Sequence, residues 1–381
     1  MVLAGELDAL VDRAPVEGSP VLSVYLDIDQ SVSSNWNRGF EISLKNVLRA
    51  VEEKLGEDRT RREAFLADAA RVWEFVSSYT PAGKGLVIMC DASEDYFWHR
   101  NVQVRMPNAA RWVPKPYVRP LVEARDEYER YGVILTDRQQ ARLFVVFLGE
   151  VEEERETLAR FKVRQYKAPG KDRIWSQMVF QRKADVHAKW HLKRVAEMMA
   201  RLEEEQEFER LVIGGPTDAV NAIEPLLTER LRSRLIGFAS LPVNASAKEI
   251  LSETNRLEQA YERHSEKELV DLLLTAAAKE RRAVTGLGAT VHAAVEGRVM
   301  SLVYEEGRQA RGAECEACGS LFEEQPEQCP NCGGTVQALD DLMERLVERA
   351  AKTGDSVELV RGEAAETLER EGGGIGAFLR F

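Results

Sequence analysis

The chain has 381 residues, of which 44% are apolar, and 52 basic side chains face 64 acidic ones, for a formal net charge of -12. At about 100 to 200 residues per domain, this length predicts two or three domains with apolar cores and excludes a disordered acidic tail. The negative charge also excludes a protein that coats DNA, bulk RNA or anionic lipid through its average charge, because such binding needs Lys and Arg to neutralise phosphates.

The first segment, residues 1–125, is predicted to be an N-terminal α/β domain. Its expected elements are a strand, two amphipathic helices and a two-stranded hairpin, at 21–29, 39–55, 60–78, 85–90 and 95–104. Four prolines lie between Pro107 and Pro120. They exclude a regular helix or a central strand, so this stretch is predicted to be the linker that closes the domain.

The second segment, residues 126–282, is predicted to be a middle domain with a mixed sheet. It begins with a hairpin, and strands then alternate with helices, a pattern typical of α/β domains. The acidic stretch Glu150–Glu156 is expected to be a solvated turn. The elements expected after the hairpin are a strand near 158–166, a long helix at 185–208, strands at 210–215 and 235–241, and helices at 218–232 and 246–282.

The third segment, residues 283–381, is predicted to be a small α/β/α sandwich, in which strands alternate with helices. A cysteine-rich stretch at 313–335 interrupts this pattern and is expected to be an inserted loop. The predicted fold class is therefore α/β, with three domains that each combine a mixed sheet with helices.

The termini and the apolar runs indicate a soluble protein. The first 18 residues have no basic region and carry Glu6, Asp8 and Asp12, which is atypical of a signal peptide. No run approaches the roughly 18 apolar residues that a membrane helix needs. We therefore expect a cytoplasmic protein without a membrane partner, and a monomer in solution.

Four of the five cysteines form two CxxC pairs, Cys315 with Cys318 and Cys329 with Cys332, separated by ten residues. Each pair can place two thiolates at adjacent corners of a tetrahedron, and four cysteines leave no coordination position for a catalytic water. The spacing predicts structural zinc, with iron or disulfides as alternatives. The metal would fold its own loop, and whether the tip of that loop also contacts RNA stays open. The fifth cysteine, Cys90, ends an apolar run and is expected to be a buried thiol.

The stretch 162–194 reverses the overall charge, because ten basic residues there face only Asp172 and Asp185. Such a run is commonly a solvated helix face. Here a loop with Pro169 and Gly170 leads through Trp175-Ser176-Gln177 into the predicted long helix, and loops mounted on rigid helices often carry function. The alternative to a solvated helix face is an RNA-binding surface, on which the basic side chains contact the phosphates of the RNA backbone. The residues assigned to it are Lys167, Lys171, Arg173, Trp175, Arg182, Lys183, Lys189 and Lys193.

Two further side-chain types in this stretch allow more than one interpretation. Trp175 can stack on a base or anchor the loop locally. His187 and His191 are four residues apart on the predicted helix and could share a ligand. No third ligand is near them in the sequence, so exposed or RNA-facing histidines are favoured.

A hairpin, a basic loop that ends in glutamine, and a long helix before the strand RLVIGG together resemble the middle domain of the class I translation release factors of archaea and eukaryotes. The segment AVTGLGATVHAAVEGRVMSLVY, the cysteine insertion and the ending GGGIGAFLRF resemble that family's carboxy-terminal domain. The similarity covers about 130–381 and is greatest to bacterial relatives, whose loop commonly reads Trp-Ser-Gln. It implies an RNase H-like middle domain and a C-terminal domain similar to kink-turn-binding ribosomal proteins, with a zinc-ribbon insertion.

The resemblance also implies a function for the loop. In that family the loop carries Gly-Gly-Gln and enters the peptidyl transferase centre, so Gln177 takes the position of the catalytic glutamine, and Trp175 and Ser176 replace the two glycines. An amide neither gives nor takes a proton near neutral pH, so Gln177 would position water, and its backbone N–H would help to stabilise an oxyanion. The implied partners are large-subunit rRNA and peptidyl-tRNA. We therefore assign catalytic roles to Gln177 and Ser176.

The first segment matches neither of the family's stop-codon motifs, Asn-Ile-Lys-Ser and Tyr-Cys. The favoured hypothesis is therefore a ribosome rescue factor that hydrolyses the peptidyl-tRNA ester without decoding. The alternative is a non-catalytic ribosome- or RNA-binding factor that acts in hibernation, assembly or surveillance. A tRNA nuclease would need acidic metal ligands, which the sequence does not place around the loop.

Overall fold

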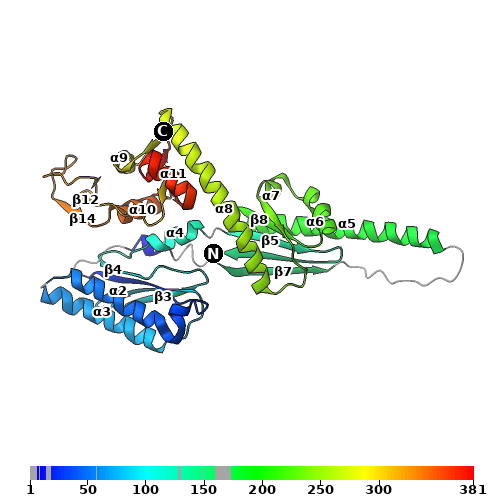
Figure 1. Ribbon diagram of the computed structural model, residues 1–381, viewed down its shortest axis with the longest axis horizontal. Helices are drawn as coiled ribbons and strands as arrows, with labels where there is room; N and C mark the ends of the chain where they lie inside the picture. The colour runs from blue at the N-terminus through cyan, green and yellow to red at the C-terminus, as the bar shows by residue number, and fades with distance from the viewer. Residues whose placement is uncertain are drawn as a thin grey trace. The chain divides into compact units, whose positions relative to one another are not determined.

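A computed structural model describes residues 7, 9–13, 19–56, 58–127, 130–147, 149–158 and 173–381, and for residues 173–184 it describes the backbone only. Within these ranges the chain forms four β-sheets with packed helices, which confirms the mixed α/β class (Figure 1). It divides into two compact units: unit 1 combines Met1–Glu127 with Glu262–Phe381, and unit 2 is Tyr128–Tyr261. This division is coarser than the three predicted domains, whose boundaries after residues 125 and 282 stay a prediction.

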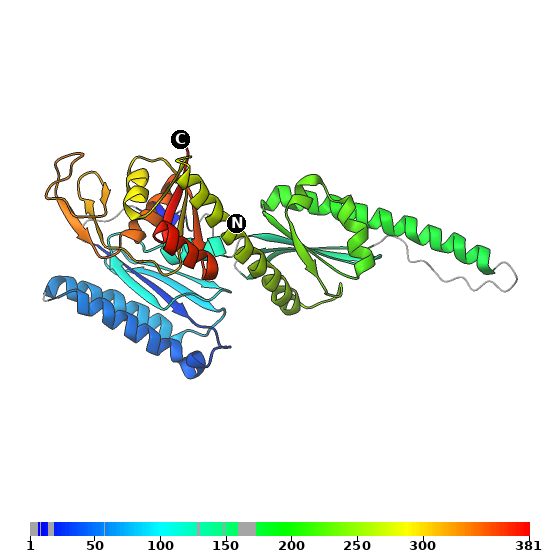
Figure 2. The ribbon, with the colours of Figure 1, turned by 45° about the horizontal axis from the view of Figure 1, so that its top comes forward.

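The N-terminal part of unit 1 is an antiparallel sheet of order β3-β2-β1-β4, with two helices on one face (Figure 2). Its elements are β1 (Val21–Asp27), α2 (Gly39–Lys54), α3 (Arg59–Ser78), β2 (Gly85–Asp91), β3 (Tyr96–Val102) and β4 (Ala109–Val113). Alternate residues of β1, Leu22, Val24 and Leu26, are fully buried in a core that includes Phe40 of α2 and Phe65 of α3. The predicted strand, the two helices and the β2–β3 hairpin are confirmed.

The proline-rich stretch contains a strand, so its interpretation as a linker is wrong for Ala109–Val113. These residues form β4, which pairs with β1 at the edge of the sheet. The strand fits between Pro107 and Pro114, and an edge position tolerates nearby prolines because one side of the strand needs no N–H donors. Pro120 is the second residue of α4 (Arg119–Glu127), where a missing N–H breaks no helical hydrogen bond.

Arg119 joins the N-terminal and C-terminal parts of unit 1. Its side chain is only 6% exposed. Its guanidinium donates to Glu123 Oε1 at 2.7 Å, to Asp341 Oδ2 at 3.0 Å and to the carbonyl oxygen of Arg308 at 2.8 Å. The hydroxyl of Tyr304 donates to the same Glu123 carboxylate at 2.8 Å. These contacts connect residues about 190 to 220 positions apart, and they explain in part why the two ends of the chain form one unit.

The C-terminal part of unit 1 has a sheet of order β10-β16-β11-β15. Its elements are β10 (Ala283–Thr285), α9 (Leu287–Val295), β11 (Val299–Glu305), α10 (Leu342–Thr353), β15 (Ser356–Val360), α11 (Gly362–Gly372) and β16 (Ile375–Leu379). The second half of α8 (Ala247–Ala278) and α11 share a core with β11 and β15. Helices α9 and α10 pack against each other and against β11. Between β11 and α10, the cysteine segment forms its own three-stranded sheet, β13-β12-β14.

Unit 2 is built on a sheet of order β7-β6-β5-β8-β9. The first three strands are antiparallel, whereas β8 runs parallel to β5 and β9 parallel to β8. Its elements are β5 (Tyr131–Thr136), β6 (Gln140–Phe147), β7 (Glu150–Leu158), α5 (Arg173–Gln206), β8 (Arg210–Gly214), α6 (Thr217–Ile223), α7 (Glu229–Ser233), β9 (Leu235–Ala239) and the first part of α8. Leu192, Val195, Met199 and Leu202 of α5 are buried in a core on one face of the sheet, and Ile250 of α8 is buried in a second core.

Three predictions for unit 2 are wrong in detail. The acidic stretch is not a turn, because Glu150–Leu158 forms the edge strand β7, while the strand expected near 158–166 lies almost wholly outside the described residues. The helix expected at 218–232 is interrupted, because Pro225 cannot continue an α-helix and separates α6 from α7. Finally, α5 begins at Arg173, twelve residues earlier than predicted. None of the helices in the described part of the chain has the length and apolar character that crossing a membrane requires.

Candidate functional site: the cysteine cluster and helix α5

The four predicted metal ligands lie together. The Sγ atoms of Cys315, Cys318, Cys329 and Cys332 are all within 4.8 Å of one another. Those of Cys315 and Cys332 are 3.5 Å apart, and those of Cys318 and Cys329 are 3.6 Å apart. A tetrahedron with zinc–sulfur bonds of about 2.3 Å has edges of about 3.8 Å, so these sulfur atoms can hold a metal ion such as zinc.

The two CxxC turns have the same backbone hydrogen bonds. The carbonyl oxygen of Cys315 accepts from the N–H of Gly319, and that of Cys329 accepts from Gly333, at 2.9 and 2.8 Å. Both glycines have positive φ, 65° and 73°, which favours glycine over any other residue. Gly334 is needed for another reason: a Cβ atom there would lie 3.3 Å from the Sγ atoms of two of the cysteines. The sequence thus shapes two turns whose thiols converge.

The exposed thiols of the cluster influence one another's pKa values. Hydrogen bonds with Ser320 lower the pKa of Cys318 to about 6. The backbone of Gly334 lowers the pKa of Cys332, but hydrogen bonds with the thiols of Cys318 and Cys315 outweigh it and raise that pKa to about 12. One thiolate therefore opposes the ionisation of the next one. A divalent metal ion would hold all four cysteines as thiolates. The four thiolates would fill every ligand position of a tetrahedral ion, so such a site would stabilise the fold and could not bind a reacting water.

The predicted catalytic residues lie in helix α5 rather than in a loop. Since α5 begins at Arg173, the backbone of Trp175, Ser176 and Gln177 belongs to its first two turns. These residues lack the apolar spacing of a packed helix, so the sequence does not indicate this early start. Beyond the first turn of an α-helix, each N–H donates to the carbonyl oxygen four residues back. Gln177 is the fifth residue of α5, so its N–H is used in helical hydrogen bonding.

Only part of the predicted basic surface can be placed. Lys167 and Lys171 lie outside the described residues, and for Arg173, Arg182 and Lys183 the structure gives a backbone position on α5. Lys189 and Lys193 are exposed on the same helix, as is Arg194. The exposed cations therefore continue along α5 towards the sheet of unit 2.

Two side chains of this helix differ from expectation. His191 is only 5% exposed, so the prediction of an exposed imidazole is wrong for it. Burial lowers the pKa of His191 despite a hydrogen bond with the backbone of Gln140, which favours a neutral ring. Trp190 is one of the apolar residues of the predicted long helix, yet it is 72% exposed. The described residues contain no metal-ligand cluster apart from the four cysteines, so no metal site joins His187 to His191.

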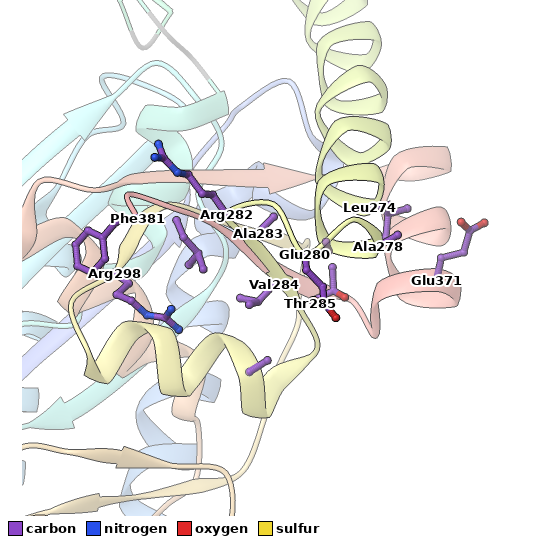
Figure 3. Close-up of a pocket in the computed structure, with 13 residues that line it drawn as sticks. Leu274, Ala278, Glu280, Arg282, Ala283, Val284, Thr285, Arg298, Glu371 and Phe381 are labelled. Atoms are coloured by element: carbon purple, nitrogen blue, oxygen red, sulfur yellow. The ribbon is translucent and has the colours of Figure 1, made fainter.

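A hollow of about 750 Å³ in unit 1 lies beside the end of α8, β10 and α9 (Figure 3). Its wall is partly apolar, with Leu274 and Val284, and it carries charges of both signs: Arg282 and Arg298 against Glu280 and Glu371. Arg298 is already paired with Glu296 at 2.7 Å. Balanced charges favour neither an anionic nor a cationic ligand. None of the predicted site residues lines this hollow.

Comparison with known proteins finds similar solved structures. No curated protein matches the sequence. Among solved structures, the archaeal translation termination factor aRF1 is 18% identical, with 100% of this chain and 97% of that chain covered and a TM-score of 0.27. Pelota from Archaeoglobus fulgidus is 18% identical over 80% of this chain and 81% of its own, with a TM-score of 0.34. Dom34 of S. cerevisiae, a translation termination-like factor, is 11% identical over 78% and 86%, with a TM-score of 0.39.

The match to a protein family is confined to one region. Residues 116–259 match bacterial archaeo-eukaryotic release factor family 10. This region includes Gln177, the basic stretch and all of the unit 2 sheet. The resemblance to bacterial relatives of class I release factors, predicted from the sequence, is therefore confirmed, and residues 116–259 are the release-factor-like region of this chain.

Proposed function

We propose that this protein is a ribosome-associated release or rescue factor that acts in the cytoplasm and hydrolyses the peptidyl-tRNA ester in the peptidyl transferase centre, without decoding a stop codon. The single observation that carries this proposal is the family match over 116–259, a region that retains Gln177. The proposed partners are large-subunit rRNA and peptidyl-tRNA. We also propose that the four clustered cysteines of the C-terminal part bind structural zinc.

The proposed domains follow from the same resemblance. Residues 126–282, which include all of unit 2, would form an RNase H-like middle domain, and the sheet of three antiparallel strands extended by two parallel ones supports this assignment. Residues 283–381 would form a domain similar to kink-turn-binding ribosomal proteins. The three-stranded sheet around the cysteines supports a zinc-ribbon insertion at 313–335.

The chemistry assigned to α5 is positioning and charge stabilisation. The side-chain amide of Gln177 would orient the attacking water, and orientation of reactants can lower a barrier by up to about 7 to 11 kcal/mol. The positive end of the helix dipole favours a developing negative charge at this point.

Peptide release from stalled ribosome complexes tests the proposal. Gln177→Ala should slow release by about 10²- to 10³-fold, the effect of removing one group that stabilises the reacting oxygen. The matched control is Gln181→Ala, the same change four residues further along the same helix, which should leave the rate within twofold. Equal release by wild type and Gln177→Ala would contradict catalysis by this glutamine.

The second candidate function is a non-catalytic ribosome- or RNA-binding factor. The helical backbone at Trp175–Gln177 favours it, because the resemblance implies a loop that reaches the ester bond. Cosedimentation with large ribosomal subunits separates the two functions: binding without release, in wild type as in Gln177→Ala, would assign the non-catalytic role. Reversing the charges of Arg182 and Lys183 should weaken cosedimentation, and the wild-type interaction should weaken steeply with salt.

A further inference from the structure

Trp190 lies on helix α5, next to the part of the helix whose side chains pack against the sheet of unit 2. The buried face of the helix begins at the next residue, His191, and continues with Leu192, Val195 and Ala196. At 100° per residue, Trp190 lies almost opposite the mean direction of these side chains. Its ring therefore points away from the core, which accounts for its 72% exposure.

Exposure of one apolar side chain is common and needs no function. Two further observations distinguish Trp190. Lys193 and Arg194 are three and four residues along the helix, so they are its neighbours on the same surface, and Lys189 precedes it; all three cations are exposed. Within the described part of the chain, moreover, no hydrogen bond, ring contact or cation–π contact involves the indole. Its flat faces are free, and cations flank them.

The neighbouring acidic groups leave this surface positive. Asp185 is 3.3 Å from Arg138, which also pairs with Asp218 at 2.8 Å and so ties α5 to α6. Glu197 lies 3.9 Å from Lys193, but both side chains are at least 60% exposed, and such a pair is weak and easily exchanged for a phosphate. The buried contacts of Leu192, Val195 and Ala196 hold the adjoining part of α5 against the sheet, as a stacking platform at Trp190 requires.

We propose that Trp190, with Lys189, Lys193 and Arg194, binds an unpaired nucleotide of RNA: the indole stacks on the base, and the cations contact the flanking phosphates. Stacking requires a base that is free of its neighbours, so the partner is single-stranded or bulged RNA rather than a continuous duplex. The proposal deepens the proposed function and rests on it, because it names the RNA element that α5 contacts. Trp190 lies about 20 Å along the helix axis from Gln177, so this contact is separate from the reacting bond.

Binding of a fluorescein-labelled single-stranded RNA of twelve nucleotides to the full chain, followed by anisotropy, tests the proposal. Trp190→Ala should weaken binding by about 5- to 150-fold, the range expected for the loss of one base–aromatic stack. Trp190→Phe should retain most of the affinity. The matched control is Trp73→Ala, an exposed tryptophan on helix α3 of unit 1, which should change nothing. A duplex of the same sequence should lose less than twofold with Trp190→Ala.

Several results would overturn the proposal: no measurable single-strand binding by the wild type, equal affinities of wild type and Trp190→Ala, or equal losses on single strand and duplex. Self-association of the wild type that Trp190→Ala abolishes, without an effect on RNA, would assign the surface to a protein partner instead. A peptide-release assay distinguishes failure of this proposal from failure of the proposed function. The Trp190→Ala protein should release peptide slowly at low protein concentration and reach the wild-type rate at saturating concentration. The Gln177→Ala protein should stay slow at every concentration.

Discussion

Replacement of Arg119 by alanine should destabilise unit 1 far more than the loss of an ordinary ion pair. The side chain is 6% exposed and satisfies two carboxylates and one carbonyl oxygen at 2.7 to 3.0 Å. Burial lowers the pKa of Arg119, but Glu123 and Tyr304 with Tyr117 together outweigh burial and raise that pKa, so the guanidinium stays charged. Without it, Asp341, which is only 9% exposed, keeps a charge that has lost its partner. Removing one member of a buried pair costs about 3 to 5 kcal/mol.

The melting temperature gives a direct readout of this cost. For a unit of this size, each kcal/mol lowers the melting temperature by about 2 to 4 °C, so a loss of about 6 to 20 °C is expected. Differential scanning calorimetry can measure it, and the transition of unit 2 should not shift, because every contact of Arg119 lies in unit 1. The matched control is Arg59→Ala. Its pair with Glu63 is also 2.8 Å long, but its side chains are 91% and 65% exposed, and exposed pairs contribute about 0 to 1 kcal/mol.

A second substitution separates charge from packing. Asp341→Asn removes the stranded charge but keeps an acceptor for the N–H of Met343 at the start of α10. In the Arg119→Ala background it should therefore recover part of the lost stability. If Arg119→Ala lowers the melting temperature no more than Arg59→Ala does, Arg119 does not join the two parts of unit 1.

Two further predictions concern thiols and pH in unit 1. Zinc-loaded protein should contain one zinc per chain. Chelation should make the exposed Cys318 and Cys332 reactive to a thiol reagent before Cys90, because the thiol of Cys90 is fully buried. Reactivity of all five cysteines with metal bound would contradict the site. Burial, which outweighs Arg263, raises the pKa of Glu266 from 4.5 to about 7. Between these two pKa values the folded state binds a proton that the unfolded state has lost, so the free energy of unfolding should fall as pH rises from about 4.5 to 7. Urea unfolding at pH 5 and pH 8 measures this change, and Glu266→Gln should remove it. The same pH dependence in the wild type and in Glu266→Gln would contradict the raised pKa of Glu266.

The parts of the fold that were predictable depend on local chemistry. The β5–β6 hairpin follows from two apolar runs around a short polar turn, and the alternation within β1 reports a strand with one face on the α2–α3 core. The cysteine cluster is predictable for a stronger reason. Each CxxC turn needs only its own residues and the glycines just beyond, Gly319 and Gly333, so its geometry is nearly independent of the remaining structure.

The errors arise where distant residues decide the structure. Glutamate disfavours strands, but β7 pairs with β6 on one side only, and Arg142 lies 2.7 Å from Glu154 across that pair. Apolar character alone also cannot separate a core residue from one on the outer face of a helix. Val186 and Trp190 are apolar, yet both are exposed, because they lie on the side of α5 opposite to the residues buried against the sheet of unit 2.

The position of the acidic stretch 150–156 in the fold allows an interpretation other than general repulsion of RNA. A net charge of -12 excludes binding through average charge, and it is natural to read the acidic stretch 150–156 as part of that repulsion. In the structure residues 150–156 lie in the edge strand β7, and charged residues on an edge strand disfavour pairing with a strand of another molecule. This effect concerns the edge of the sheet, and it does not oppose the RNA contact proposed for α5. In this chain one helix carries the basic residues and one edge strand carries the acidic ones. The sign of the total charge therefore does not predict whether that helix can contact RNA.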